Sequence, residues 1–369
     1  MVSHGYYPRI GGIERQRAAV TARLRERHFE PSVVCRRDPG TLPFELIRGI
    51  PVHRIRVRGP KVLASVVFTV AATIRVLRLR PDVVQVHQFL STARVGLLAT
   101  RLRRVPLVAV AHRSGPIGDV QRYGSRRTGR RRVAALSRRA AMLVGVSEEI
   151  CEEIQGLGVP SDRVRLVRNG IDSDRFRQRT LTERLALRNR LMLDADAVIV
   201  LAVGRLAPEK RVGDLVRACR RLPNPNLVLL IAGDGSERAA LEAQAAGDDR
   251  IRFLGIQDDV APLYSAADIF VLCSEAEGLS NAALEACASG TAVVLTDVGA
   301  AADIVRPEVD GLLIRPGDVD GLAAALELLA RDPARRAQLG QSARERVTAE
   351  FDIEGTVSQF EKLYEELLP

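Results

Sequence analysis

The feature that most constrains the fold of this chain is a twofold series of short apolar runs that alternate with helix-like segments. Apolar runs of this length, bounded by turn residues, are typical of buried strands. In the first half they lie near residues 31–35, 52–57, 82–87, 106–112, 142–147 and 164–167, and in the second half near 197–204, 226–233, 250–255, 269–274, 291–296 and 311–316. Because strands alternate with helices, we predict an α/β fold with one doubly wound parallel sheet in each half.

A polar, turn-rich stretch separates the two sets of runs, and a chain of 369 residues is too long for one ordinary core. We predict an N-terminal domain over 1–170, a linker over 171–195 and a C-terminal domain over 196–350. The last helix-like segment, 351–369, is expected to pack back on the N-terminal domain. Two domains imply a deep cleft between them.

Composition excludes several classes of protein. With 46% hydrophobic residues and a mean hydropathy near zero, the chain reads as soluble and globular. The apolar run 62–74 is interpreted as a buried or surface-lying helix, too short to cross a bilayer. The N-terminus lacks the apolar core of a signal peptide, so export is not expected. Five cysteines without CxxC spacing predict reduced cytosolic thiols and no metal cluster.

The charge of the chain is divided unevenly. Residues 1–170 hold 32 Arg and Lys against 12 Asp and Glu, whereas residues 171–369 hold 23 against 33. This asymmetry favours an anionic partner for the N-terminal half, such as a phosphorylated acceptor, an acidic lipid surface or nucleic acid. Only three of the 55 basic residues are lysines, however, so the codon bias of a GC-rich genome is an equal alternative.

In open parallel sheets, ligands bind beyond the carboxyl ends of strands, where the chain turns into a helix. The first such turn holds Gly11 and Gly12, ahead of an amphipathic helix. Their backbone N–H groups could approach an anion at the start of the helix, although a double glycine is also typical of an ordinary tight turn.

A second turn follows the predicted strand 197–203. Gly204 ends this strand, Arg205 lies in the loop, and Lys210 opens the next helix. A guanidinium and an ammonium at this place can both bind phosphate oxygens. The alternative is an ordinary basic loop, which the scarcity of lysine makes weaker.

A third turn, within "SEAEGLSNAALEACASG" (274–290), holds Glu277 in a loop and Glu285 about one turn into a helix that Ser280 or Asn281 caps. A buried carboxylate accepts two hydrogen bonds from paired sugar hydroxyls, and the N–H groups near residues 279–281 would face a phosphate. The alternative is a helix-dipole glutamate and an unrelated loop acid.

Taken together, these motifs resemble the family-4 retaining glycosyltransferases, whose GT-B fold consists of two facing Rossmann-like domains. The resemblance covers the whole chain and rests on "YYPRIGGIERQ", "LVAVAHRSG", "LVGVSEEI", "VRNGIDSDRF", "VGRLAPEK", "LIAGDGSER", "DGLLIRPGD" and the stretch from "FLGIQDDV" to "GTAVV". It implies a cytoplasmic enzyme of glycan or glycoconjugate biosynthesis, and the basic N-terminal half leads us to expect peripheral contact with the inner face of the membrane.

The resemblance also implies roles for individual residues. Arg205 and Lys210 correspond to the pair that binds the donor diphosphate, Glu285 to the acid that binds the ribose, and Glu277 to the acid that contacts the transferred sugar. His112 corresponds to the histidine near the reacting centre, while His87 and His4 have weaker cases. The remaining implied donor contacts are made by Gly11, Gly12, Gly204, Gly233, Leu254, Gly278, Leu279, Ser280 and Asn281.

The implied reaction is retaining transfer of a sugar from a UDP- or GDP-sugar to an unidentified acceptor, for which an anionic or lipid-linked compound is one candidate. It needs no metal ion, since Arg205, Lys210 and helix-terminal N–H groups can neutralise the charge that grows on the leaving phosphate. Nucleic acid is not an expected partner. Two alternatives are a non-hydrolysing nucleotide-sugar epimerase and a catalytically weak protein that binds a nucleotide sugar. The chain departs from the family pattern at Ala300, where a second glycine is common, and Arg113 directly follows His112.

Overall fold

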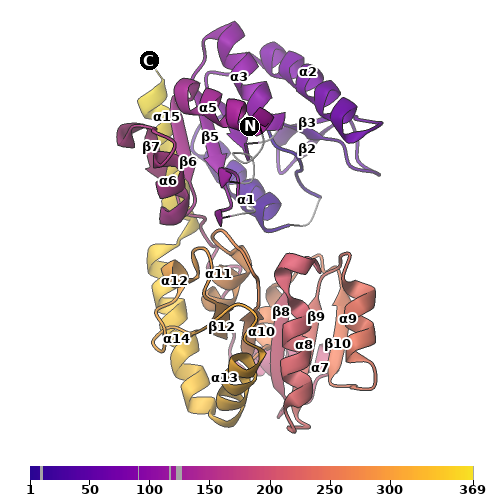
Figure 1. The fold of residues 1–369 in the computed structure, drawn as a ribbon. Coiled ribbons are helices and arrows are strands. Elements are labelled where there is room, and N and C mark those ends of the chain that lie inside the picture. The colour runs from indigo at the N-terminus through magenta and orange to yellow at the C-terminus, as the bar shows by residue number, and fades with distance from the viewer. Residues whose placement is uncertain (9–10, 90, 116–117, 122–126, 369) are drawn as a thin grey trace. The chain divides into compact units, whose positions relative to one another are not determined.

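The computed structural model describes residues 1–8, 11–89, 91–115, 118–121 and 127–368. The chain divides into two compact units. Unit 1 comprises residues 1–169 and 353–369, and unit 2 comprises residues 170–352 (Figure 1).

Unit 1 has two strand groups, with the orders β1-β3-β2 and β4-β5-β6-β7. Val2 forms parallel bridges to Val34 and Val86 and so lies between β1 and β4. All strand pairs are parallel except β2 with β3, a hairpin whose turn residues Arg48 and Gly49 both have positive φ. The sequence pattern missed β2. The strands are β1 (Val33–Arg36), β2 (Phe44–Ile47), β3 (Ile50–Ile55), β4 (Val84–His87), β5 (Leu107–Ala111), β6 (Met142–Gly145) and β7 (Val164–Leu166).

The helices of unit 1 are α1 (Gly12–Glu26), α2 (Lys61–Leu79), α3 (Ser91–Arg103), α5 (Arg127–Arg139), α6 (Glu148–Gln155) and α15 (Ile353–Leu367), with the short 3-10 turn η2 (Ser161–Arg163). Helix α15 contacts α1, and Arg27 forms ion pairs with Glu354 (2.6 Å) and Glu361 (2.8 Å). The final helix therefore belongs to unit 1, although it follows unit 2 in the chain (Figure 1).

Unit 2 has one parallel sheet of order β10-β9-β8-β11-β12-β13. Its strands are β8 (Val198–Val203), β9 (Leu227–Ala232), β10 (Ile251–Gly255), β11 (Ile269–Leu272), β12 (Ala292–Thr296) and β13 (Leu312–Ile314). Its helices are α7 (Leu181–Arg190), η3 (Pro208–Lys210), α8 (Val212–Arg221), α9 (Arg238–Ala245), α10 (Ala261–Ala266), α11 (Asn281–Ala288), α12 (Ala301–Ile304), α13 (Val319–Arg331) and α14 (Pro333–Glu350). The predicted α/β class with parallel sheets is confirmed.

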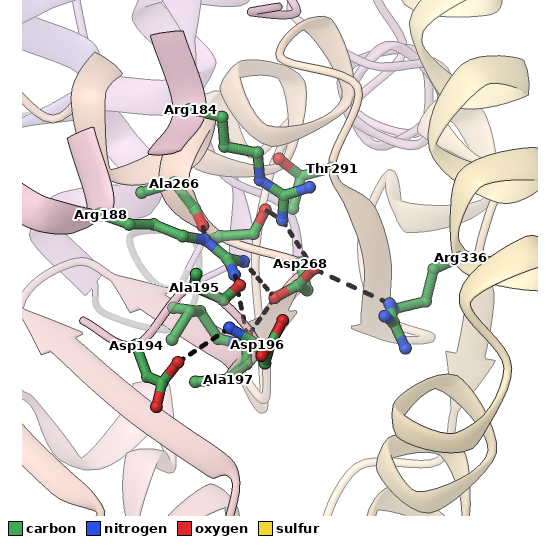
Figure 2. A network of polar contacts seen from close by, with 12 residues as sticks. Arg184, Arg188, Asp194, Ala195, Asp196, Ala197, Ala266, Asp268, Thr291 and Arg336 are labelled. Atoms are coloured by element: carbon green, nitrogen blue, oxygen red, sulfur yellow. Dashed lines mark hydrogen bonds and ion pairs between the residues drawn. The ribbon is translucent and has the colours of Figure 1, made fainter. Parts of the chain in front are cut away.

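The segment 171–195, expected as a linker, is instead part of unit 2. Its helix α7 packs on α10, and Arg184 and Arg188 each donate to the Asp268 carboxylate at 2.6 Å (Figure 2). Arg188 also donates to the backbone carbonyls of Ala195 (2.6 Å) and Ala197 (3.0 Å). The sequence pattern misled us because the arginines of this polar stretch pair with an acid more than 70 residues away. Such a long-range contact leaves no local sequence pattern, so the stretch was interpreted as a linker.

The apolar run 62–74 lies within a longer helix than expected. Helix α2 spans 19 residues and is long and apolar enough to cross a membrane by length and composition alone. Helix α2 contacts α3, β1 and β3, yet only 28% of its most apolar 18-residue stretch is buried within the protein. The expectation that this segment is too short to span a bilayer was therefore wrong, whereas a helix lying at the surface agrees with its contacts.

Candidate functional site

The strand order of unit 2 reverses between β8 and β11, which places a crevice beyond the carboxyl ends of these two strands. The loop after β8 carries Arg205 and Lys210, and the loop after β11 carries Glu277. The Lys210 ammonium donates to the Glu277 carboxylate across this switch point. Residues 67 positions apart, both proposed from the sequence, are thus in direct contact at the place where such sheets bind ligands.

The loop of Glu277 is held in place by its neighbours. The hydroxyl of Ser274, a fully buried residue, donates to Glu277 Oε1 at 2.6 Å. Gly299 has φ +56°, and a Cβ there would lie 2.4 Å from the Glu277 carbonyl oxygen. The next residue, Ala300, has φ −91° and donates its N–H to the Gly278 carbonyl at 3.4 Å. The departure from a second glycine at this turn is therefore accommodated without a left-handed conformation.

Arg205 is the most exposed residue of this group, with 58% of its side chain accessible. Its guanidinium forms an ion pair with Glu209, and the Glu209 carbonyl accepts a hydrogen bond from Glu275 N–H at 2.8 Å. The loops after β8 and β11 are thus joined by backbone as well as by Lys210. A pocket of about 340 Å³, open to solvent, includes Gly204, Arg205 and Lys210 in its lining.

Close backbone packing explains Gly233, the glycine after β9. A Cβ on Gly233 would lie 1.8 Å from the Gly204 carbonyl oxygen, so only glycine fits. Gly204 N–H in turn donates to the Ala232 carbonyl at 3.0 Å. Leu254 lies near the end of β10, where its carbonyl accepts from Gln257 Nε2 at 2.7 Å. These residues end adjacent strands at the same edge of the sheet as Arg205.

Helix α11 begins where the sequence predicted. Ser280 is its N-cap and accepts a hydrogen bond from Ala283 N–H, and Leu279 is buried. Asn281 Oδ1 is buried and has no hydrogen-bond partner among the described residues. Glu285, one turn later, is 7% exposed, and the buried Tyr264 hydroxyl donates to its carboxylate at 2.8 Å. The structure therefore fixes the orientation of Glu285 within unit 2.

In unit 1, His112 follows β5 and His87 ends β4. Their rings stack, with Nδ1 of His87 2.9 Å from Nε2 of His112. Asp119 accepts from His112 N–H at 2.8 Å and so fixes this corner of the backbone. Burial, followed by the nearby Arg17 and Arg113, lowers the pKa of His112 to about 3, so the imidazole is neutral at physiological pH. His112 Nδ1 has no hydrogen-bond partner among the described residues.

The glycine turn of unit 1 opens a helix, as predicted. Gly12 is the first residue of α1, and Gly11 is its N-cap and provides no side-chain hydrogen bond. A Cβ on Gly11 would lie 2.3 Å from the Glu14 carboxylate. Residues 9 and 10 of this motif lie outside the described residues.

Sequence reasoning missed two residues that support the candidate site, Ser274 and Tyr264, which orient Glu277 and Glu285. It gave His87, which contacts His112, only a weaker case. Tyr264 lies on another helix and has no motif spacing to Glu285. The signal for His87 was its place at a strand end adjacent to that of His112.

In each of the three Asp-x-Asp pairs of the sequence, 172–174, 194–196 and 318–320, the first acid has a local structural role. Asp172, Asp194 and Asp318 each accept a backbone N–H two or three residues later. Among the described residues, no group of three or more His, Cys, Asp or Glu side chains could hold a metal ion.

Two family models match the chain. The model described as Glycosyltransferase Family 4 matches residues 10–175, and the model described as Glycosyl transferases group 1 matches residues 183–346. The two matches follow one another and cover most of both units.

Individual relatives agree with these models. The glycogen synthase of Mycobacterium tuberculosis is 32% identical over 77% of this chain and 69% of its own length. The N-acetyl-alpha-D-glucosaminyl L-malate synthase of Bacillus anthracis is 26% identical over 98% of this chain and 96% of its own length. The solved structure of Anabaena HepE in complex with UDP and glucose superposes with a TM-score of 0.85, with 22% identity and coverage of 99% of both chains.

These matches confirm the family and the GT-B fold that the sequence motifs predicted. The chain therefore belongs to the family-4, group 1 glycosyltransferases, which are retaining, nucleotide-sugar-dependent enzymes.

Proposed function

We propose that unit 2 binds the diphosphate and sugar of a UDP-sugar at the switch point between β8 and β11. The observation that carries this proposal is the contact of Lys210 with Glu277 at that switch point, beside Arg205. An ammonium has three N–H donors, so pairing with Glu277 leaves Lys210 able to bind phosphate oxygens. The choice of UDP is supported by Anabaena HepE, whose solved complexes contain UDP-glucose.

Each residue has a distinct proposed role. Arg205 and Lys210 bind the diphosphate, Glu277 orients the transferred sugar, and Glu285 binds the ribose. The N–H groups of residues 278–281 face a phosphate at the start of α11. Gly204, Gly233 and Leu254 contribute backbone contacts to the donor from unit 2. Gly11 and Gly12 contribute backbone N–H groups from the start of α1 in unit 1.

The chemistry follows from charge. When the bond between the sugar and the β-phosphate breaks, negative charge grows on the leaving phosphate, and fixed cations and N–H dipoles stabilise that charge. We propose that the leaving phosphate takes the acceptor proton on the same face, so the anomeric configuration is retained. His112, neutral and buried, serves as a hydrogen-bonding group toward the transferred sugar. No metal ion is needed for this scheme.

We propose an acceptor with an anionic group. Two kinds of relative are named for such compounds, the L-malate synthase of Bacillus anthracis and the D-inositol 3-phosphate glycosyltransferases. Arg113, next to His112, is the cation best placed in sequence to bind such a group. We also propose a role in glycan or glycoconjugate biosynthesis in the cytoplasm, with peripheral contact between the basic unit 1 and an anionic membrane.

The donor is tested by incubating the protein with a panel of UDP- and GDP-sugars, with and without L-malate, inositol phosphate and lipid-phosphate acceptors. Acceptor-dependent release of UDP with the α-configured product from an α-configured donor is the expected result. Conversion of the donor sugar without an acceptor would instead indicate an epimerase. Binding of nucleotide sugar with neither reaction would indicate a catalytically weak binding protein.

A further inference from the structure

Helix α2 has its apolar side chains on the wrong face for a helix that only covers a sheet. The face toward the core is built mostly from small and polar residues, Ala64, Thr69, Ala72 and Thr73, with Phe68 and Val76 as its two larger side chains. The Thr69 and Thr73 hydroxyls donate to carbonyls one turn earlier, at 2.7 Å each, so these polar side chains are satisfied within the helix. Val76 is the one large aliphatic residue of α2 that is buried, so the packing of the helix depends little on those between Val62 and Ile74.

Those aliphatic residues point outward. They recur at helical spacing over three turns and form a continuous apolar stripe, which we call the α2 stripe: Val62 (78% exposed), Leu63 (54%), Val66 (48%), Val67 (38%), Val70 (52%) and Ile74 (44%). From Val62 to Ile74 the helix has no charged residue. Adjacent helix α3 adds the exposed Leu98 and Leu102. Isolated exposed aliphatic residues are ordinary, whereas a contiguous stripe of them marks an interaction surface.

The surroundings of the stripe are strongly basic. Lys61 precedes it, Arg78 and Arg80 follow it, and the end of α3 exposes Arg101, Arg103 and Arg104. Across residues 46–118 there are 13 Arg and Lys but one acid, Asp82. A helix with an apolar face and cationic flanks matches the interface of an anionic bilayer, where aliphatic side chains enter the acyl boundary and arginines contact headgroup phosphates.

We propose that α2 is a monotopic membrane anchor, which lies in the plane of an anionic lipid surface with the α2 stripe inserted. A second copy of the chain is the less suitable occupant, because a symmetric contact through this face would bring the arginines at its rim against one another. The inference deepens the proposed membrane contact of unit 1 by assigning it to one helix, and it does not require the proposed sugar transfer.

The test uses full-length protein and vesicles of phosphatidylcholine with or without phosphatidylglycerol. The wild-type protein is expected to sediment with the anionic vesicles. Double substitution Val66→Asp and Val70→Asp is expected to weaken this binding about tenfold or more, because it places charges in the acyl boundary. Leu328→Asp, at an exposed leucine of α13 in unit 2, is the matched control and should bind like the wild type.

Charge and insertion are separated by two further measurements. Lys61→Ala with Arg78→Ala should reduce binding only to anionic vesicles, and raising salt to about 0.5 M should have the same effect. The chain has no tryptophan, so Val67→Trp provides a single probe whose emission should shift to the blue when anionic vesicles are added. A Leu328→Trp probe should not shift.

Three outcomes would overturn the anchor. The first is wild-type protein that stays in the supernatant, and the second is a Val66→Asp/Val70→Asp variant that binds vesicles like the wild type. The third is a wild-type protein that is dimeric and binds no vesicles, with a variant that is monomeric. UDP binding measured in the absence of vesicles reports the proposed function separately. An intact UDP site in the variant would also show that the protein remains folded.

Discussion

Helices α2 and α13 cover sheets in different units and distribute their apolar residues in opposite ways. In α13, Leu322, Leu326 and Leu329 are fully buried in the core of unit 2, and Leu328 is the one large apolar residue that is exposed. In α2, the core-facing side is mostly small and polar around Phe68 and Val76, and six large aliphatic residues are exposed. Helix α13 covers its sheet with most of its large apolar side chains turned inward. The exposed apolar side chains of α2 are therefore not needed to cover a sheet, and they indicate a partner outside the fold.

The two units also differ in net charge, unit 1 being basic and unit 2 acidic. Unit 1 contains 33 Arg and Lys against 16 Asp and Glu, whereas unit 2 contains 22 against 29. Despite its negative charge, unit 2 places Arg205 and Lys210 beside each other at the sheet switch point. The difference suggests a division of tasks in which unit 2 handles the donor and unit 1 handles the acceptor and the surface on which it is found.

The largest expected effect is on turnover. Lys210→Ala or Arg205→Ala should lower the rate of nucleotide release by about 10²–10³, since each removes a cation from the leaving phosphate. Lys362→Ala, which removes an exposed lysine of α15, is the control and should leave the rate unchanged. If both site variants release nucleotide at the wild-type rate, Arg205 and Lys210 do not bind the donor diphosphate.

A second effect concerns the stability of unit 2 alone. Arg188→Ala should destabilise it by roughly 3–5 kcal/mol, because the nearly buried Asp268 carboxylate loses one of its charge partners. Arg190→Ala, at an exposed position of the same helix, should change little. Peptide-resolved hydrogen exchange in urea can locate the loss, and equal weakening of unit 1 would contradict the assignment of α7 to unit 2.

The two units should also respond to acid at different pH. Burial, with Arg17 as the next cause, lowers the folded pKa of both His87 and His112, well below the 6.5 of an ordinary histidine. The unfolded chain therefore binds more protons below about pH 6.5, and the stability of unit 1 falls as the pH falls from there toward the folded pKa values.

In unit 2 one group whose pKa is lowered on folding is Asp310. Burial raises its pKa, but hydrogen bonds from Arg306 and Ser342 outweigh burial and lower it to about 2. The contribution of Asp310 to the stability of unit 2 is complete above 3.8, the ordinary pKa of an aspartate, and is lost as the pH falls toward 2. Hydrogen exchange, corrected for the intrinsic effect of pH, should show unit 1 weakening first. His87→Leu should reduce the acid sensitivity of unit 1. If both units weaken together, and only below about pH 4, the buried histidines do not control the acid stability of unit 1.

The smallest expected effect is that of metal removal. Because Arg205 and Lys210 supply the positive charge, dialysis against EDTA should leave the rate of nucleotide release within error of the untreated rate. Recovery of a lost rate by added Mg²⁺ or Mn²⁺ would show that a metal shares this task.

Much of this architecture could be predicted because it depends on local patterns. The buried parallel strands are continuous apolar runs, and Ser280 gives the start of α11 directly. The contact of Lys210 with Glu277 was foreseeable in outline, since carboxyl ends of neighbouring parallel strands meet at one edge. The support by Tyr264, the pairing of Arg188 with Asp268 and the outward face of α2 could not be predicted, because each depends on which long-range neighbour occupies one side of a helix.

The central claim is that unit 2 binds the diphosphate of a nucleotide sugar through Lys210 and Arg205. Thermal unfolding in the presence of UDP-sugars tests it most directly, since a ligand that binds only the folded protein raises the melting temperature. We predict that a UDP-sugar stabilises the wild type and the Lys362→Ala control but stabilises Lys210→Ala much less. Equal stabilisation of all three, or no stabilisation of the wild type by any nucleotide sugar, would contradict the account.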